Sequence, residues 1–103
     1  MNKVMLSGSI ATEPKQVAEG IVIFNMVAIG EYNTKRRKHD TDLVPVKTRG
    51  KLADYVVENA SVGQQIEVDA KMTSRKTDDK FFSDVEGINV RLGHKSMKSE
   101  DLE

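Results

Sequence analysis

The stretch that decides the fold runs from Ile21 to Arg49 and reads IVIFNMVAIGEYNTKRRKHDTDLVPVKTR. Both of its ends are apolar and rich in β-branched residues, which is typical of strands. Between them stand four consecutive basic residues, Lys35-Arg36-Arg37-Lys38. Adjacent cations do not fit a core, so the stretch predicts a hairpin with an exposed cationic tip. Runs of this kind usually serve only solubility, but a tip on a small β domain is also suited to contact a phosphate backbone.

The first half of this hairpin, Ile21–Ile29, is apolar at both parities. A strand of this composition is covered on both of its faces. In so small a domain we expect the second cover to be another subunit or a ligand. We assign Val27 and Ile29 to part of a subunit interface.

The second half of the hairpin, Leu43–Arg49, contains Val44, Val46 and Thr48 at positions that suit a core. Proline has no amide hydrogen to donate to a neighbouring strand, so Pro45 predicts a sheet edge or a bulge at its position.

Three further strands and one helix are expected outside the hairpin. Alternating apolar and polar residues predict the strands, which are residues 2–10, 65–75 and 81–92. Inward positions in the strand 65–75 are 66, 68, 70 and 72. Leu52, Tyr55 and Val56 form one apolar stripe, which predicts a helix over residues 51–60. Three methionines are expected to fill the core or an interface: Met5, Met26 and Met72.

The last strand contains two adjacent aromatic residues, Phe81 and Phe82. Neighbouring strand residues point to opposite faces, so one ring is expected in the core and the other exposed as a candidate for stacking. A change of apolar parity later in this strand predicts a bulge near Gly87.

Three strands, a short helix and two more strands follow the order of the OB-fold. We therefore expect an all-β domain with one short helix, built as a five-stranded Greek-key barrel. It comprises residues 1–93, and residues 94–103 form a short polar tail with an acidic end, which we expect to be disordered.

Composition restricts the function. The 103 residues suit one domain, and their formal net charge is zero. Residues 96–103 hold one lysine and three acidic residues, which leaves 15 basic and 13 acidic residues in the rest. No cysteine is present, and the two histidines, His39 and His94, have no partners at ligand spacing. We expect no enzyme activity, metal or cofactor. The absence of an apolar leader or a membrane-spanning run predicts a cytoplasmic location.

The opening strand, Asn2-Lys3-Val4-Met5-Leu6-Ser7-Gly8, resembles that of bacterial and phage single-stranded DNA-binding proteins. Phe24–Ala28, followed by Glu31-Tyr32, is similar to the second strand of that family. The other matching pieces are Gly50–Ala53, Val62–Ile66, Thr73–Lys76 and Leu92-Gly93. Together they extend over residues 2–93.

The resemblance implies an OB-fold that forms homo-oligomers, tetramers or dimers, and acts in DNA replication, recombination or repair. It also implies sequence-tolerant binding of single-stranded DNA by stacking on aromatic rings and by a basic groove. Tyr32 is the expected stacking residue. The expected phosphate contacts are Lys35, Arg36, Arg37, Lys38, Lys47, Arg49, Arg75, Lys76 and Lys80.

The chain also departs from this family. It contains no tryptophan, and Leu43, Arg49 and Thr77 stand where the family often has aromatic residues. Residues 99–103 are much shorter than the family's tail, so replication and repair proteins are possible partners but the tail motif that would recruit them is weak. One alternative is a diverged, primosomal-type OB module that bridges proteins and binds DNA weakly. Another is a substrate-binding OB module that serves an enzyme.

Overall fold

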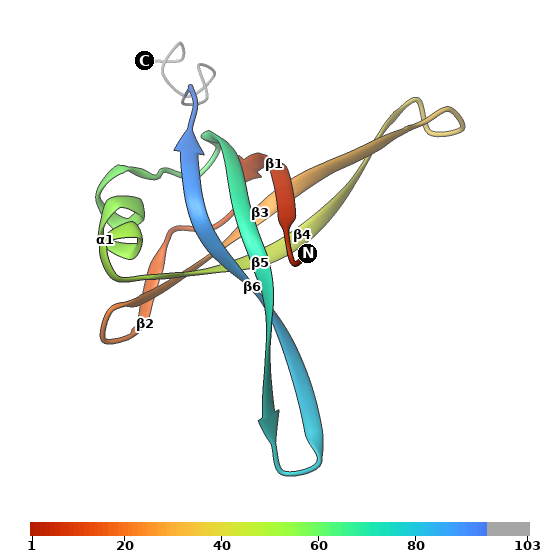
Figure 1. The fold of residues 1–103 in the computed structure, drawn as a ribbon. Coiled ribbons are helices and arrows are strands. Elements are labelled where there is room, and N and C mark those ends of the chain that lie inside the picture. Colours follow the sequence, from red (N-terminus) through yellow and green to blue (C-terminus); the bar gives the residue numbers. More distant parts are fainter. Residues whose placement is uncertain (95–103) are drawn as a thin grey trace.

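Two long antiparallel hairpins dominate the computed structural model, which describes residues 1–94. The first joins β3 (Ile21–Asn33) to β4 (Lys38–Arg49), and the second joins β5 (Gln65–Thr77) to β6 (Lys80–Leu92). One end of each hairpin belongs to a barrel. The other ends project from it in different directions (Figure 1). We call these projections the β3–β4 arm (residues 29–42) and the β5–β6 arm (residues 72–84).

The barrel closes through β1 (Val4–Ile10), which pairs with β5 on one side and with β3 on the other. A short parallel pairing of β4 with β6 joins the two hairpins, with Val46 opposite Val85 and Lys47 opposite Glu86. Five strands thus form a closed barrel, and the prediction of an all-β OB-fold with one short helix is confirmed. Pro45 lies just outside the β4–β6 pairing, so the edge predicted from it is also present.

A further strand, β2 (Lys15–Ala18), pairs with β3 and was not predicted. All four of its residues are exposed, and they carry no alternating apolar pattern. The turn between the two strands contains Gly20, whose φ of 72° favours glycine. β2 is therefore stabilised by its pairing with β3 and by this turn. Burial of its side chains does not contribute, because all of them are exposed.

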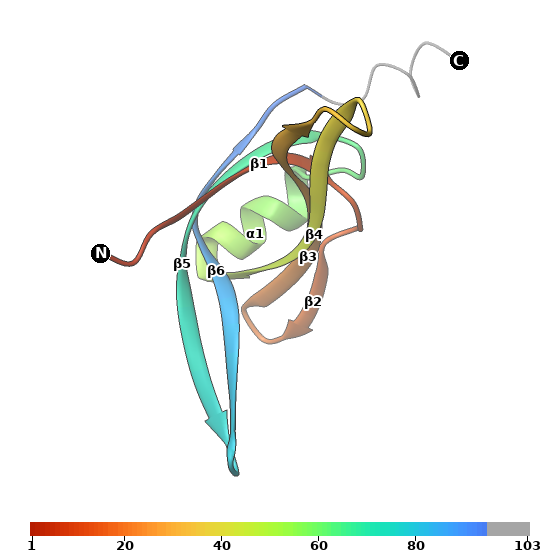
Figure 2. The same cartoon turned by 90° about the vertical axis from the view of Figure 1, so that its right-hand side faces the viewer.

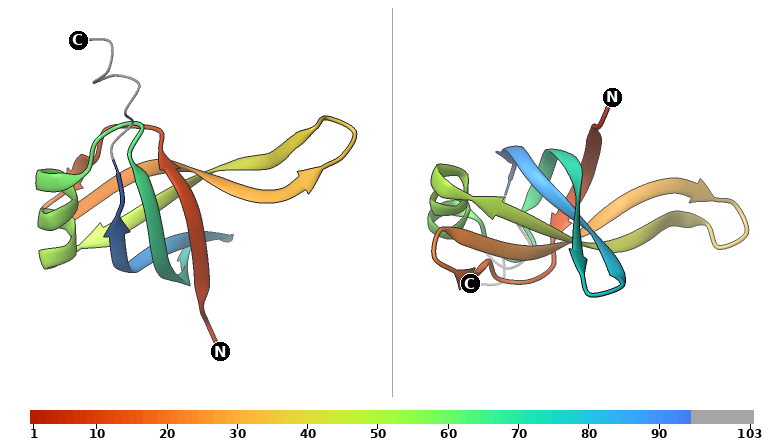
Figure 3. Two further views of the ribbon diagram at one scale, coloured as in Figure 1. Left: turned by 90° about the horizontal axis from the view of Figure 1, so that it is seen from above. Right: turned by 60° about the horizontal axis from the view of Figure 1, so that its bottom comes forward.

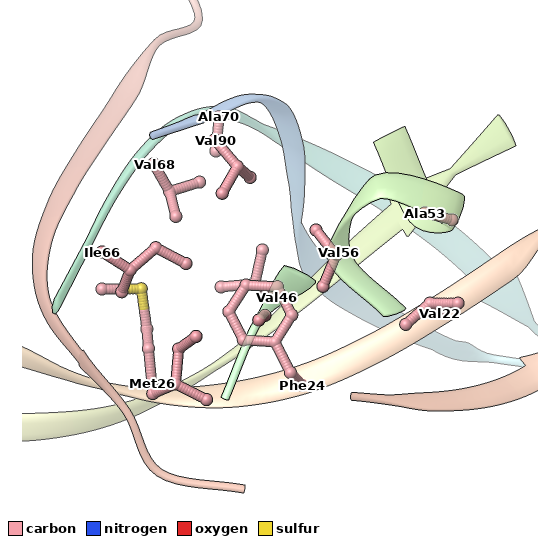
Figure 4. Packing of buried hydrophobic residues seen from close by; sticks show 12 residues of the cluster. Val22, Phe24, Met26, Val46, Ala53, Val56, Ile66, Val68, Ala70 and Val90 are labelled. Atoms are coloured by element: carbon pink, nitrogen blue, oxygen red, sulfur yellow. The ribbon is translucent and has the colours of Figure 1, made fainter. Parts of the chain in front are cut away.

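The core consists of Ile10 of β1, the even positions 22–26 of β3 and 46–48 of β4, and inward residues of β5, β6 and α1 (Figure 4). Phe24, Met26 and Val46 are almost completely buried. Thr48 is buried too, and Val44 packs against the cluster, as the alternation in the hairpin predicts. Burial of this apolar area is the main stabilising contribution in so small a domain.

The helix α1 (Gly50–Asn59) contacts β3, β4 and β6 (Figure 2). Its buried residues are Ala53 and Val56, with Leu52 partly buried against the core. Tyr55 was predicted to belong to the packed stripe, but it is 42% exposed. The small Ala53, rather than Tyr55, faces the barrel, so the tyrosine lies on the flank of the helix.

Several predictions for β5 and β6 are wrong because the apolar pattern continues past the end of the core. Met72 was expected to face the core but is exposed. Met5 on β1, expected in the core or in an interface, is exposed in the single chain and so is not part of the core. Neither phenylalanine of β6 is buried, although one was predicted to be. The bulge near Gly87 is confirmed: Gly87 and Asn89 pair with consecutive residues of β5, and the residue between them, Ile88, is exposed.

In residues 1–94 no helix has the length and apolarity needed to cross a membrane. The same part of the chain contains no cluster of His, Cys, Asp or Glu residues that could hold a metal ion. Residues 95–103 of the predicted acidic tail lie outside the described residues.

Candidate nucleic-acid interface

The basic tip, Lys35–Lys38, is the turn of the β3–β4 arm. The side-chain oxygen Oδ1 of Asn33 accepts hydrogen bonds from the backbone amides of Lys35 (3.0 Å) and Arg36 (3.2 Å). Arg37 adopts the left-handed conformation that tight turns require, with a φ of 58°. All four cationic side chains are exposed, and among residues 1–94 none forms an ion pair. The turn therefore presents four cations that are not ion-paired, in a defined backbone conformation.

Tyr32 lies beside the basic tip, opposite His39 across the hairpin. The two rings meet edge to face with centroids 5.3 Å apart. The Nδ1 atom of His39 is 3.0 Å from the carbonyl oxygen of Gly30, to which it can donate a hydrogen bond. Tyr32 remains 54% exposed. Its ring is therefore held on one side by His39 and available to a ligand on the rest of its surface.

Lys47 and Arg49 lie at the base of the arms, where β4 meets β6. Lys47 lines a small hollow of about 150 Å³ with Pro45 and Val85. The Nε atom of Arg49 is 3.2 Å from Oε1 of Glu86. The charge of Arg49 is thus partly compensated within the protein, whereas Lys47 forms no ion pair in the described part of the chain.

The β5–β6 arm carries three basic and three acidic residues, so it has no net charge. Its basic residues are Arg75, Lys76 and Lys80, and its acidic residues are Asp78, Asp79 and Asp84. Arg75 forms an ion pair with Asp84, with 3.0 Å between Nε and Oδ2. The β3–β4 arm has four basic residues and three acidic ones, so the two arms differ less in net charge than in the clustering of four adjacent cations at the basic tip.

The structure divides the predicted phosphate contacts into three groups. The basic tip is at the far end of one arm, and Arg75, Lys76 and Lys80 are on the other (Figure 3). Lys47 and Arg49 lie near the crossing of the two hairpins, where β4 pairs with β6. A ligand that contacts all three groups has to pass over this crossing and follow both arms.

Sequence reasoning did not find the arrangement of aromatic rings on the β5–β6 arm. Phe81 is 74% exposed and Phe82 is 40% exposed. The guanidinium carbon of Arg75 lies 4.8 Å from the ring centroid of Phe82, and Nζ of Lys76 lies 5.5 Å from that of Phe81. The sequence does contain a signal for this arrangement. Two adjacent cations are followed by two adjacent aromatic residues, with a short polar turn between the pairs as in a hairpin.

A separate polar cluster lies on β5 and β6 near β1. Arg91 forms ion pairs with Asp69 (2.9 Å) and Glu67 (3.1 Å). The hydrogen bond from Arg91 lowers the pKa of Asp69, and those from Arg91 to Asp69 and Glu67 raise the pKa of Arg91. Arg91 and Glu67 also line an open hollow of about 840 Å³. Its single arginine is compensated by carboxylates, so this face is a poorer site for phosphates than the basic tip.

A family model described as "Single-strand binding protein family" matches residues 1–95. Among solved structures, the chain is similar to one described as "Plasmodium falciparum SSB complex with ssDNA", with a TM-score of 0.71 and 17% sequence identity. The similarity covers 91% of this chain and 96% of that chain. At this level of identity it concerns the fold. No curated protein sequence matches the chain significantly.

Proposed function

Because the chain belongs to the single-strand binding protein family, we propose that it binds and protects single-stranded DNA without sequence preference. The observation that carries this proposal is the basic tip, whose four exposed cations stand next to the exposed ring of Tyr32. Non-specific binding of single strands needs both elements, because rings stack on bases while lysine and arginine contact phosphates. We assign this binding to DNA replication, recombination or repair, in the cytoplasm.

In the proposed mechanism, a phosphate backbone contacts the basic tip and one base stacks on Tyr32. Each phosphate neutralised on a single strand contributes about −0.7 to the slope of log K against log salt. Stacking on one ring contributes about 1–3 kcal/mol and depends little on sequence. The absence of tryptophan leaves charge as the larger contribution, so affinity for oligo-dT should fall steeply as salt rises.

The remaining predicted contacts have a secondary role in this proposal. Arg49 and Arg75 are ion-paired with Glu86 and Asp84, so a phosphate has to compete with a carboxylate for them. Lys47, Lys76 and Lys80 form no ion pair within residues 1–94, although Lys47 lines the same hollow as Asp84. They extend the contact from the crossing of the hairpins along the β5–β6 arm.

We also propose that the chain forms homo-oligomers through the outer face of β3 and β4. Val27 and Leu43 are cross-strand partners on this face, and Ile29 follows along β3. Ile29 and Leu43 are exposed in the single chain. Burial of such residues between subunits would stabilise an oligomer. Sedimentation of the protein and of an Ile29→Lys, Leu43→Lys variant would measure this, and an unchanged mass would refute the assignment.

A second candidate function is an OB module that bridges proteins and binds DNA weakly. The exposed Leu43, at a position where an aromatic residue is common in the family, favours it. Reversal of charge with Arg36→Glu and Arg37→Glu separates the candidates. Under the first proposal it abolishes binding to oligo-dT and leaves the oligomer intact. Unchanged DNA binding by the double variant would favour the protein-bridging function instead.

A further inference from the structure

The two phenylalanines of the β5–β6 arm lie on opposite faces of a two-stranded ribbon. Phe82 is the cross-strand partner of Arg75, and Phe81 is the partner of Lys76. Cross-strand partners share a face of a sheet, whereas successive residues of a strand alternate between faces. One face of the arm therefore holds Phe82 with Arg75, and the other holds Phe81 with Lys76.

On each face the cation lies over the ring, at 4.8 Å for Arg75 and 5.5 Å for Lys76. These distances are within the range of cation–π attraction. The attraction restricts the rotation of each phenylalanine before a ligand arrives. A ring with a fixed orientation loses less conformational entropy on binding than a freely rotating one.

Both rings are open to solvent. Phe81 is 74% exposed and Phe82 is 40% exposed. Packing within residues 1–94 therefore does not explain why an aromatic residue stands at either position. The far end of the arm stands away from the other described elements (Figure 1). Each ring thus keeps a surface on which a flat, apolar group of similar size can stack.

We propose that the β5–β6 arm carries two nucleobase-stacking sites, one on each face, each formed by a phenylalanine and its neighbouring cation. This inference rests on the proposed function and deepens it, because it names the part of the ligand that the arm binds. A base stacks on the open side of each ring, and Arg75 or Lys76 lies within reach of an adjacent phosphate. Single-stranded DNA therefore contacts both sides of the arm rather than only one.

The two sites differ in charge. Asp84 is two residues from Phe82 on β6, so it shares that face, where it forms the ion pair with Arg75. Lys76 forms no ion pair among the described residues. A phosphate near Phe81 therefore gains an uncompensated cation. Lys76→Gln should reduce the salt slope by about 0.7, and Arg75→Gln should reduce it by less.

The absence of tryptophan from the chain allows a direct test. Phe81→Trp and Phe82→Trp each introduce a single tryptophan as a fluorescent reporter on one face. Tyr55→Trp is the matched control, because Tyr55 is 42% exposed but lies on α1. Titration with oligo-dT at low salt should quench the fluorescence of tryptophan at positions 81 and 82, but not at 55. Phe81→Ala and Phe82→Ala should each weaken binding about 5- to 150-fold.

Quenching at only one of the two positions would overturn the inference of two sites. Quenching at neither, with oligo-dT still bound in a native gel, would overturn both sites and leave the proposed function intact. Failure of the unsubstituted protein to bind oligo-dT would overturn the proposed function and this inference with it. Blue-shifted emission from position 81 or 82 before DNA is added would show that protein covers the ring, which also contradicts the inference.

Discussion

The hydroxyl of Thr48 donates a hydrogen bond of 2.9 Å to the backbone carbonyl oxygen of Val22 inside the barrel. The two residues are cross-strand partners on β4 and β3, and Thr48 is completely buried. A buried hydroxyl without a partner would destabilise the fold, and this bond supplies one. It also joins the two strands at the end of the hairpin that leads into α1.

Replacement of this threonine with valine tests the bond. Thr48→Val keeps the side-chain volume but removes the donor, so it should lower the free energy of unfolding by about 1 kcal/mol. Urea denaturation measures the change. Thr77→Val, at an exposed position at the end of β5, is the control and should stay within about 0.5 kcal/mol of the original. Equal stability of the two variants would show that the bond contributes nothing.

Closure of the barrel depends on glycine at position 8. Gly8 is the partner of Ala28 on β3 and of Ile66 on β5, and a Cβ there would collide with the carbonyl oxygen of Val27. Gly8→Ala should therefore destabilise the fold by about 3 kcal/mol, the upper end of the usual range for overpacking, because backbone rather than a flexible side chain has to move. Thermal unfolding compared with the exposed Ser7→Ala checks this. Similar midpoints for the two variants would contradict the described closure.

The Asp69–Arg91 pair predicts part of the acid sensitivity. Arg91 holds the pKa of Asp69 below its ordinary value in the folded chain. The stability from this shift is present above the unfolded-state pKa of about 4 and is lost as the pH falls through the lower folded-state value. Asp69→Asn and Arg91→Gln should each lose this component. The fall in the urea midpoint between about pH 6 and pH 3 measures this component, and it should be smaller in both variants than in the original protein. If the midpoint falls equally in all three proteins, the assignment is wrong.

Tyr32 should contribute through its ring rather than its hydroxyl. Tyr32→Phe keeps the stacking surface and should bind oligo-dT almost as well as the original. Tyr32→Ala should lose about 1–3 kcal/mol of binding free energy. Tyr55→Ala on α1 is the control for removal of an exposed tyrosine. Fluorescence anisotropy of labelled oligo-dT measures all three, and equal affinities for Tyr32→Ala and Tyr55→Ala would refute the role of Tyr32 in stacking.

The barrel could be predicted from the sequence because its strands have one buried and one exposed face. Val46 and Thr48 were correctly placed in the core for this reason. The lengths of the arms could not be predicted, since alternation identifies the faces of a strand but not where the core ends. Met72 and Phe81 therefore continue an inward pattern into the β5–β6 arm, where both are exposed.

The candidate site was predictable only in part. Four adjacent charges cannot be buried together, so the exposure of the basic tip follows from composition alone. The ion pairs of Arg49 and Arg75 could not be predicted in this way. Their partners on β6 are 37 and 9 residues away in the sequence, and only the pairing of the strands brings them together. The pairing of β5 with β6 also places a cation over each phenylalanine. This arrangement can be recognised in the sequence only when the register of the two strands is known.

The central claim is that the basic tip binds the phosphates of single-stranded DNA, and the salt dependence of oligo-dT binding tests it most directly. Arg36→Gln with Arg37→Gln should reduce the slope of log K against log salt by about 1.4, which corresponds to two phosphate contacts. Lys15→Gln with Lys51→Gln removes two exposed charges on β2 and α1 and should leave the slope unchanged. If the slope of the Arg36, Arg37 variant equals that of the unsubstituted protein, the basic tip does not contact the phosphates and the account is wrong.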